Sequence, residues 1–164
     1  RIVQSGAWRS CQILRTDAKT RASTPMAYVE RVNLAIDHVV LRVRSLQRAL
    51  RFYCEALGCR EERRIEPLGL VQLRAGTSLI DLVDAEGALG RLGGPPPGEV
   101  GRNLDHVALR IAAFDETALR AHLEAHGVAP GDVGIRYGAE GNGPSLYIRD
   151  PDGNVIELKG PPSA

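Results

Sequence analysis

Several scarcities in this 164-residue sequence narrow the classes of protein that it can encode. Cysteine occurs three times, at Cys11, Cys54 and Cys59, without a Cys-X-X-Cys motif, which fits a reducing compartment better than a disulfide framework. Aromatic residues make up 4% of the chain, so we expect a core of Leu, Val, Ile and Ala. No apolar run approaches the roughly 18 residues of a membrane-spanning helix. We interpret Cys54 and Cys59 as small hydrophobic residues rather than as a metal or redox pair.

Charge is also nearly balanced. The formal net charge is +1, with 43% hydrophobic and 25% charged residues, which is typical of a globular protein without a nucleic-acid or membrane partner. Residues 1–25 differ from the rest, because they hold five basic residues and one acid, Asp17. They resemble a transit peptide or a translated leader upstream of Met26, and we exclude them from the fold. We predict a cytoplasmic protein, with organellar import as the alternative if this segment is a genuine transit peptide.

From residue 34 onward, alternation and turn signals predict a repeated order of elements. Residues 34–83 read as strand, helix and three strands: Ala35–Val43, Ser45–Gly58, Arg60–Ile65, Leu68–Arg74 and Ser78–Val83. Ser45 is a good helix N-cap and Gly58 a C-terminal stop. Residues 84–103, rich in glycine and proline, are expected to form a linker. Residues 104–162 then repeat the order: Leu104–Ile111, a helix at Asp115–His126, and strands Val128–Tyr137, Ser145–Arg149 and Asn154–Lys159.

The repetition extends to the residues themselves. "IDHVVLRV" at the start of the first half returns as "LDHVALRI" in the second, and "LIDL" in its last strand returns as "VIEL". We therefore predict an internal duplication. Each half offers a histidine on its first strand, His38 or His106, and a carboxylate on its last strand, Asp81 or Glu157. Two imidazoles and two carboxylates suit Ni, Co, Mn, Fe or Zn and leave positions open for substrate.

Other polar groups receive a plainer interpretation. His122 and His126 are spaced as a helical metal pair, but the HExxH order is absent and they are predicted to lie near the solvated face of a helix. Gly141, Asn142 and Gly143 form a glycine-rich segment that matches no phosphate-binding spacing, and it is predicted to be a loop, with a lid over the site as a weaker alternative. Asp150-Pro151-Asp152-Gly153 is predicted to be a structural turn.

With "DHVVLRV", "FYCEALG" and "LYIRDPDGNVIEL", the chain from Leu34 to Pro162 resembles the vicinal oxygen chelate superfamily. That superfamily includes glyoxalase I, extradiol dioxygenases, fosfomycin-resistance enzymes and bleomycin-binding proteins. The resemblance implies an α+β fold of two tandem βαβββ modules whose curled mixed sheets surround one divalent metal. It implies metal ligands at His38, Asp81, His106 and Glu157. It also implies a small-molecule substrate and, by default, a homodimer.

Within the superfamily, the pattern of ligands is closest to glyoxalase I. This implies a lyase that converts the hemithioacetal of a 2-oxoaldehyde and a thiol into a 2-hydroxy thioester through an enediolate. Glu157 would be the base, Asp81 a ligand or a second base, and Arg42 would bind a carboxylate of the thiol glutathione. The chain has Asp81 where glyoxalase I has Glu, and it lacks the Asn and aromatic residues that help hold glutathione.

Two alternatives remain. An Fe(II) extradiol dioxygenase would use His38, His106 and Glu157, with Tyr147 at the position of the tyrosine in the dioxygenase signature. The histidine that begins that signature is absent, since Gly138, Ala139 and Glu140 occupy this region. The other alternative is a non-catalytic protein of the same fold that binds or sequesters a small molecule.

Overall fold

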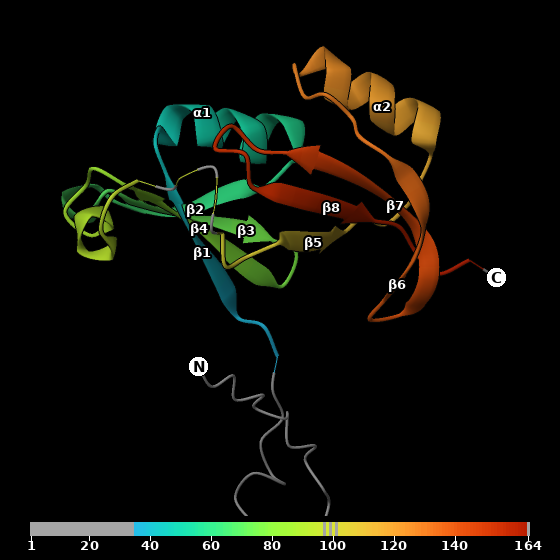
Figure 1. Ribbon diagram of the computed structural model, residues 1–164, viewed down its shortest axis with the longest axis horizontal. Coiled ribbons are helices and arrows are strands. Elements are labelled where there is room, and N and C mark those ends of the chain that lie inside the picture. Colours follow the sequence, from blue (N-terminus) through green and yellow to red (C-terminus); the bar gives the residue numbers. More distant parts are fainter. Residues whose placement is uncertain (1–34, 97, 99, 101, 164) are drawn as a thin grey trace, which may run out of the picture. The chain divides into compact units, whose positions relative to one another are not determined.

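The computed structural model describes residues 35–163 except 97, 99 and 101 (Figure 1). The predicted leader, residues 1–25, lies outside the described residues. The chain divides at Ala35, and the description that follows concerns the compact unit that begins at Ile36. No described helix is long and apolar enough to cross a membrane.

Both predicted modules form. The first consists of β1 (His38–Val43), α1 (Leu46–Leu50) with its π-helical continuation η2 (Arg51–Ala56), β2 (Arg60–Ile65), the 3₁₀ turn η3 (Glu66–Leu68), β3 (Leu70–Ala75) and β4 (Ser78–Asp84). After the 3₁₀ turn η4 (Gly90–Gly93), the second consists of β5 (His106–Arg110), α2 (Glu116–Ala125), β6 (Val133–Gly138), β7 (Gly141–Arg149) and β8 (Val155–Lys159). Ser45, as predicted, and Asp115 cap the two helices through their side-chain oxygens.

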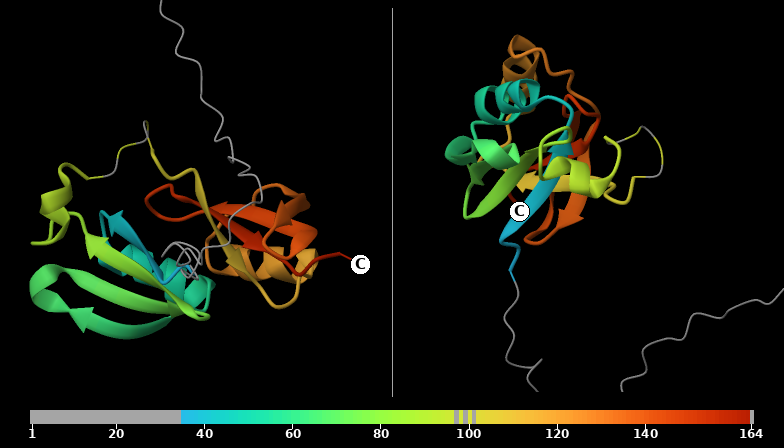
Figure 2. Two further views of the ribbon diagram at one scale, coloured as in Figure 1. Left: turned by 90° about the horizontal axis from the view of Figure 1, so that it is seen from below. Right: turned by 90° about the vertical axis from the view of Figure 1, so that its left-hand side faces the viewer.

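The two sheets have the same topology. Their strand orders are β1-β4-β3-β2 and β5-β8-β7-β6. In each sheet the first and last strands of the module pair in parallel, and the remaining pairs are antiparallel. The prediction of an α+β fold with two βαβββ modules and mixed sheets is therefore confirmed. Figure 2 shows the two sheets side by side within this unit.

Two strand boundaries in the second module differ from the prediction. Strand β6 begins at Val133 rather than Val128, since Pro130 has no backbone N–H to pair, although the amide of Gly131 still donates to the carbonyl of Tyr147 on β7. Strand β7 begins at Gly141, four residues before the predicted Ser145. The glycine-rich segment is thus part of a tight hairpin, in which Gly138 pairs with Gly141. The prediction of a loop there was wrong, because the glycines were interpreted as a break in the strand, whereas they belong to the hairpin.

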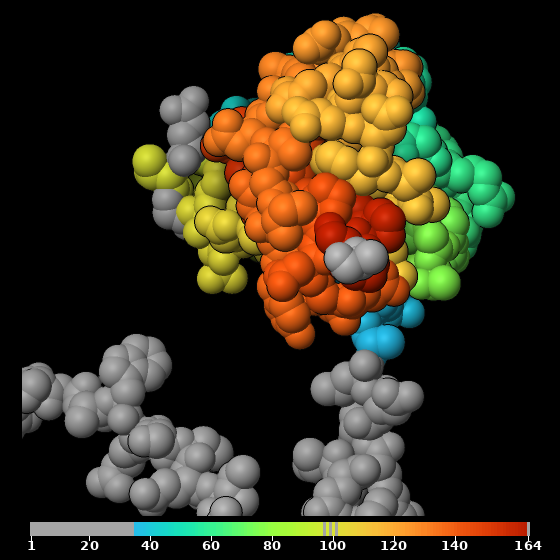
Figure 3. Space-filling view, turned by 90° about the vertical axis from the view of Figure 1, so that its right-hand side faces the viewer, coloured from blue at the N-terminus to red at the C-terminus, as the bar shows by residue number. Residues whose placement is uncertain are grey.

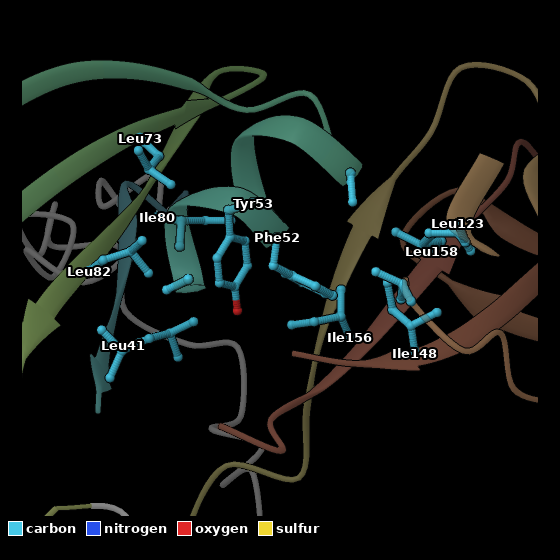
Figure 4. Close-up of a cluster of buried hydrophobic side chains, with 14 of the residues drawn as sticks. Leu41, Phe52, Tyr53, Leu73, Ile80, Leu82, Leu123, Ile148, Ile156 and Leu158 are labelled. Carbon is cyan, nitrogen blue, oxygen red and sulfur yellow. The ribbon is translucent and has the colours of Figure 1, made fainter. Parts of the chain in front are cut away.

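The core lies on one face of both sheets, where α1 and α2 also lie (Figure 1). Alternate residues of β1, such as Leu41 and Val43, join the buried cluster, while His38 and Val40 point to the opposite face. Leu146 and Ile148 of β7 join the same cluster from the second module (Figure 4). One continuous apolar core therefore supports both modules and leaves the other faces of the sheets for polar side chains.

Two polar contacts, of which the first is buried, join the modules to each other. The Tyr53 hydroxyl of the first module donates to Asp150 Oδ2 of the second at 2.9 Å. Asp150 begins the predicted DPDG turn, and its carboxylate also accepts the backbone amides of Asp152 and Asn154. Burial, together with the negative charge of Asp150, raises the pKa of Tyr53 far above its usual value, so the phenol stays a donor. The Nε2 atom of His122 contacts the carbonyl of Ala56 at 2.8 Å.

Candidate metal and substrate site

The first candidate pair comes from the two central, parallel strands of the first sheet. His38 lies at the start of β1, and Asp81 lies in β4, where it is aligned with Val40. The two residues share the face that points away from the core. Asp81 is 5% exposed, and Gln72 Nε2 from the neighbouring strand β3 donates to its Oδ2 at 2.9 Å.

The second pair occupies equivalent positions in the second sheet. His106 begins β5, and Glu157 in β8 is aligned with Ala108, two residues beyond the histidine. Glu157 is 6% exposed. Its Oε2 lies 3.3 Å from His106 Nε2 and 3.4 Å from the hydroxyl of Tyr147, which stands opposite Glu157 on β7. Tyr147 thus takes the place that Gln72 takes in the first module.

Each carboxylate keeps one buried oxygen without a partner. Among the described residues, Asp81 Oδ1 and Glu157 Oε1 are buried and accept no hydrogen bond. An isolated buried carboxylate is costly, because the charge has lost its water without gaining a counter-charge. The same feature occurs at the two equivalent positions of the duplicated fold, so each carboxylate has one oxygen available to a ligand.

The histidines are oriented for the same purpose. His38 Nδ1 lies 2.7 Å from Asp37 Oδ1, and His106 Nδ1 lies 2.8 Å from Asp105 Oδ2. A carboxylate can only accept, so Nδ1 carries the proton and Nε2 of the neutral ring is an electron-pair donor. The hydrogen bond to Asp37 raises the pKa of His38, and desolvation opposes this rise. Carboxylates that hold the far nitrogen of a histidine are a common support of metal ligands.

These atoms fit a divalent cation. In the second pair, His106 Nε2 lies 3.3 Å from Glu157 Oε2. When the ring is neutral with its proton on Nδ1, both of these atoms carry lone pairs, so a proton or a cation between them is needed to make the contact favourable. Nitrogen and carboxylate donors in this mixture suit Ni, Co, Mn, Fe or Zn. Within residues 35–163 as described, however, no three His, Cys, Asp or Glu side chains gather around one point. One chain therefore presents two separate half-sites, which we define as half-site 1 (His38, Asp81) and half-site 2 (His106, Glu157).

Arg42 and Tyr147, the predicted substrate-binding residues, have different surroundings. Arg42 donates to the carbonyls of Gly93, Gly94 and Pro95 at 2.5–3.1 Å, so its guanidinium holds the segment after η4. Its role toward substrate stays a prediction. Tyr147 does lie in half-site 2, where the guanidinium of Arg136 stacks 4.6 Å from its ring centroid.

The remaining histidines and described cysteines lie elsewhere. His122 and His126 are both on or next to α2, and each uses a ring nitrogen to contact a backbone carbonyl. That they are not a metal pair stays a prediction. Cys54 and Cys59 are free, and burial raises the pKa of Cys59 to about 11, so its thiol stays protonated at neutral pH.

Sequence reasoning missed Gln72 and did not use the two aspartates that precede the histidines. The signal for Gln72 was the register of the β3–β4 hairpin, which sets Gln72 opposite Asp81. Counting back from Glu157 across the equivalent hairpin gives Tyr147. A comparison of the two hairpins, rather than of the two acids alone, would have found Gln72 from the position of Tyr147, which the resemblance had already named.

The comparison with known proteins agrees with this geometry. Residues 35–158 match the Glyoxalase/Bleomycin resistance protein/Dioxygenase superfamily. The chain belongs to this superfamily. Among curated relatives, it is 28% identical over 124 residues to a catechol-2,3-dioxygenase of Bacillus subtilis (strain 168), covering 75% of this chain and 40% of that protein. The chain thus spans about two-fifths of the length of that relative.

Solved structures of the superfamily are similar over nearly their whole length. A virulence protein from Salmonella typhimurium shares 26% identity at a TM-score of 0.60, with 79% of this chain and 98% of that chain covered. A lactoylglutathione lyase from Agrobacterium tumefaciens shares 26% identity at a TM-score of 0.53, with 77% and 92% covered. The relatives of this superfamily member therefore include a dioxygenase and a lyase, and the choice between these chemistries depends on its own residues.

Proposed function

We propose that the protein is a metal-dependent lyase of the glyoxalase I type, which isomerises the hemithioacetal of a 2-oxoaldehyde and a thiol to a 2-hydroxy thioester. The observation that supports this most is the pair of buried carboxylates, Asp81 and Glu157, each with one oxygen free and each beside a histidine. A divalent metal held by His38, Asp81, His106 and Glu157 would supply Lewis acidity toward the two adjacent oxygens of the substrate.

The chain's own groups would carry the proton. Glu157 takes the proton from the carbon that bears sulfur and returns it to the neighbouring carbon, through an enediolate. Its free Oε1 is available for this transfer, while Oε2 is held by Tyr147 and faces His106. Glu157 is almost fully buried, which keeps bulk water away from its carboxylate during the transfer.

We propose further that a second copy of the chain completes the site. Each chain presents two half-sites that do not converge on one point among its described residues. A two-fold dimer would bring half-site 1 of one chain against half-site 2 of the other and generate two identical sites. Val40 supports this arrangement, because it lies between His38 and Arg42 on the ligand face of β1 and is 51% exposed.

The test is an isomerase assay on metal-stripped protein. Methylglyoxal is premixed with glutathione, and Ni, Co, Mn, Zn and Fe(II) are added back one at a time while thioester formation is recorded. We expect turnover that depends on the metal and is absent after chelation. Stoichiometric metal binding without turnover for glutathione or other thiols would reject the lyase and keep the metal site.

An Fe(II) extradiol dioxygenase is the second candidate, favoured by the similarity to the Bacillus subtilis catechol-2,3-dioxygenase and by Tyr147 in half-site 2. His38, His106 and Glu157 would be the three ligands. Asp81 would then be a surplus acid, and the β6–β7 turn holds no histidine that could relay a proton. Oxygen consumption by the Fe(II)-loaded protein with catechol, without thioester formation, would favour this candidate over the lyase.

A further inference from the structure

A cavity of about 290 Å³ extends from half-site 2 along the second sheet. His106 and Glu157 line one end of it. Arg110, Lys159 and Glu140 line the rest, together with the tail after β8, where Ser163 donates its amide to the carbonyl of Asn142. Figure 3 shows this tail, in red, against the orange strands of the second module. The cavity therefore joins the candidate catalytic carboxylate to a group of charged side chains.

Lys159 is the cation in this cavity that lacks a counter-charge. It is directly opposite Arg110 across the β5–β8 pair, and two like charges at such positions repel each other. Arg110 pairs with Glu140 at 2.5 Å. Among the described residues, nothing forms a hydrogen bond or ion pair with the ammonium of Lys159, although its side chain is partly buried.

Two glycines make room for this side chain. A Cβ atom on Gly143 would lie 2.8 Å from Lys159 Nζ, and a Cβ atom on Gly138 would lie 3.0 Å from its Cε. At Gly143 the carbonyl oxygen of Pro161 is nearer still, 2.4 Å from such a Cβ atom, so the backbone requires glycine there independently of the lysine. The side chain of Lys159 therefore lies against Gly138 of β6 and Gly143 of β7, in the lining of the cavity.

We propose that the substrate carries a carboxylate, separate from the two oxygens that would chelate the metal, and that Lys159 binds it. Lys159 and Glu157 are two positions apart on the same face of β8, so the two groups of the substrate are separated by roughly 7 Å. One unpaired cation calls for one negative charge, which favours a carboxylate over a doubly charged phosphate. This inference rests on the proposed metal site, and it assigns the recognition of the substrate carboxylate to Lys159.

The experiment compares two ligands that differ in one charge. Succinic acid monohydroxamate carries a chelating hydroxamate and a carboxylate, and the matched ligand has an amide in place of the carboxylate. Calorimetry measures their binding to the metal-loaded protein. We expect the carboxylate to bind about tenfold more tightly, as a charge-assisted hydrogen bond in a partly buried site allows. Lys159→Gln should abolish this preference without weakening the amide ligand, and Lys159→Arg should keep it.

A matched control removes one positive charge elsewhere. Arg51 is exposed on η2, on the core side of the first sheet, and Arg51→Gln should leave the tenfold preference intact. Equal binding of the two ligands to the wild type, or a preference that survives in Lys159→Gln, would overturn the role of Lys159 while the metal site stands. Failure of both ligands to bind would reject the metal site itself.

Discussion

Half-sites 1 and 2 have the same backbone geometry but different chemical surroundings. In half-site 1 the carboxylate is the short side chain of Asp81, supported by the neutral amide of Gln72. In half-site 2 it is the longer Glu157, in contact with an imidazole and a phenol, and it opens into a cavity. The duplicated fold thus repeats the positions of the ligands and varies their neighbours.

This difference indicates a division of work between the two acids. The amide of Gln72 fixes the orientation of Asp81 without offering a proton that moves at neutral pH. Glu157 faces groups that can hold or share protons, and its longer side chain reaches further into the cavity. We therefore propose that half-site 1 binds the metal and that half-site 2 both binds the metal and transfers the proton.

The largest expected effect comes from removing the charge of each acid in turn. Glu157→Gln should lower kcat by about 10³-fold at saturating metal, as loss of a general base does. Asp81→Asn keeps a carbonyl oxygen that can coordinate the metal but removes the negative charge, so it should lower metal affinity more than kcat. Turnover of each variant is measured over a metal titration, with thermal unfolding as the control for folding. Equal losses of kcat in both variants at saturating metal would contradict the division of work.

The next largest effect concerns the residues that support the acids. Gln72→Leu and Tyr147→Phe each remove one hydrogen bond to a ligand carboxylate, and such changes typically cost about 10–100-fold in metal affinity or activity. We expect Gln72→Leu to weaken metal binding, measured by competition with a chromophoric chelator. We expect Tyr147→Phe to lower kcat instead. If Gln72→Leu lowered kcat and Tyr147→Phe weakened metal binding instead, the roles proposed for the two half-sites would be reversed.

The arrangement of the two half-sites also depends on the hydrogen bond between Tyr53 and Asp150, which joins the modules. Tyr53→Phe removes one of the donors to the buried Asp150 carboxylate and should lower the free energy of unfolding by about 1–3 kcal/mol. Urea unfolding measures this change. Tyr137 is 81% exposed, and Tyr137→Phe is a matched control expected to change stability by less than about 0.5 kcal/mol. Similar free energies of unfolding for Tyr53→Phe and Tyr137→Phe would show that the Tyr53 hydrogen bond does not stabilise the contact between the modules.

The smallest effect is expected at Arg42. Because three backbone carbonyls of the segment after η4 occupy its guanidinium, Arg42→Gln should cost about 1 kcal/mol of stability and leave KM nearly unchanged. Steady-state kinetics with the glutathione adduct test this directly. A rise in KM of tenfold or more would instead support the role in substrate binding that the resemblance implied.

The order of elements could be predicted, and the positions of the four candidate ligands could be found, because both follow from local patterns that occur twice. "DHV" and the acid framed by aliphatic residues mark the same strand positions in both modules. Strand boundaries in the second module were harder, because Gly141 and Gly143 resemble a loop in the sequence. In the structure, Gly141 has a positive φ in the β6–β7 hairpin, and a Cβ atom on Gly143 would lie 2.4 Å from the carbonyl oxygen of Pro161. Glycine patterns do not reveal which distant group requires the missing Cβ atoms.

The supporting residues depend on contacts across the fold. Gln72 has no motif of its own and becomes recognisable only from its position opposite Asp81. The occupied guanidinium of Arg42 depends on a segment more than 50 residues away. The separation of the half-sites could not be predicted either, since the same four residues would serve a site within one chain or between two chains.

A complementation experiment tests the assembly of the site most directly. One variant lacks half-site 1 (His38→Ala with Asp81→Ala) and the other lacks half-site 2 (His106→Ala with Glu157→Ala). Each alone should be inactive. After the two are mixed and allowed to exchange subunits, half of the dimers should be mixed and hold one intact site, which gives about a quarter of wild-type activity and metal binding. A mixture as inactive as its components, with exchange verified by mass spectrometry, would contradict a site shared between two chains.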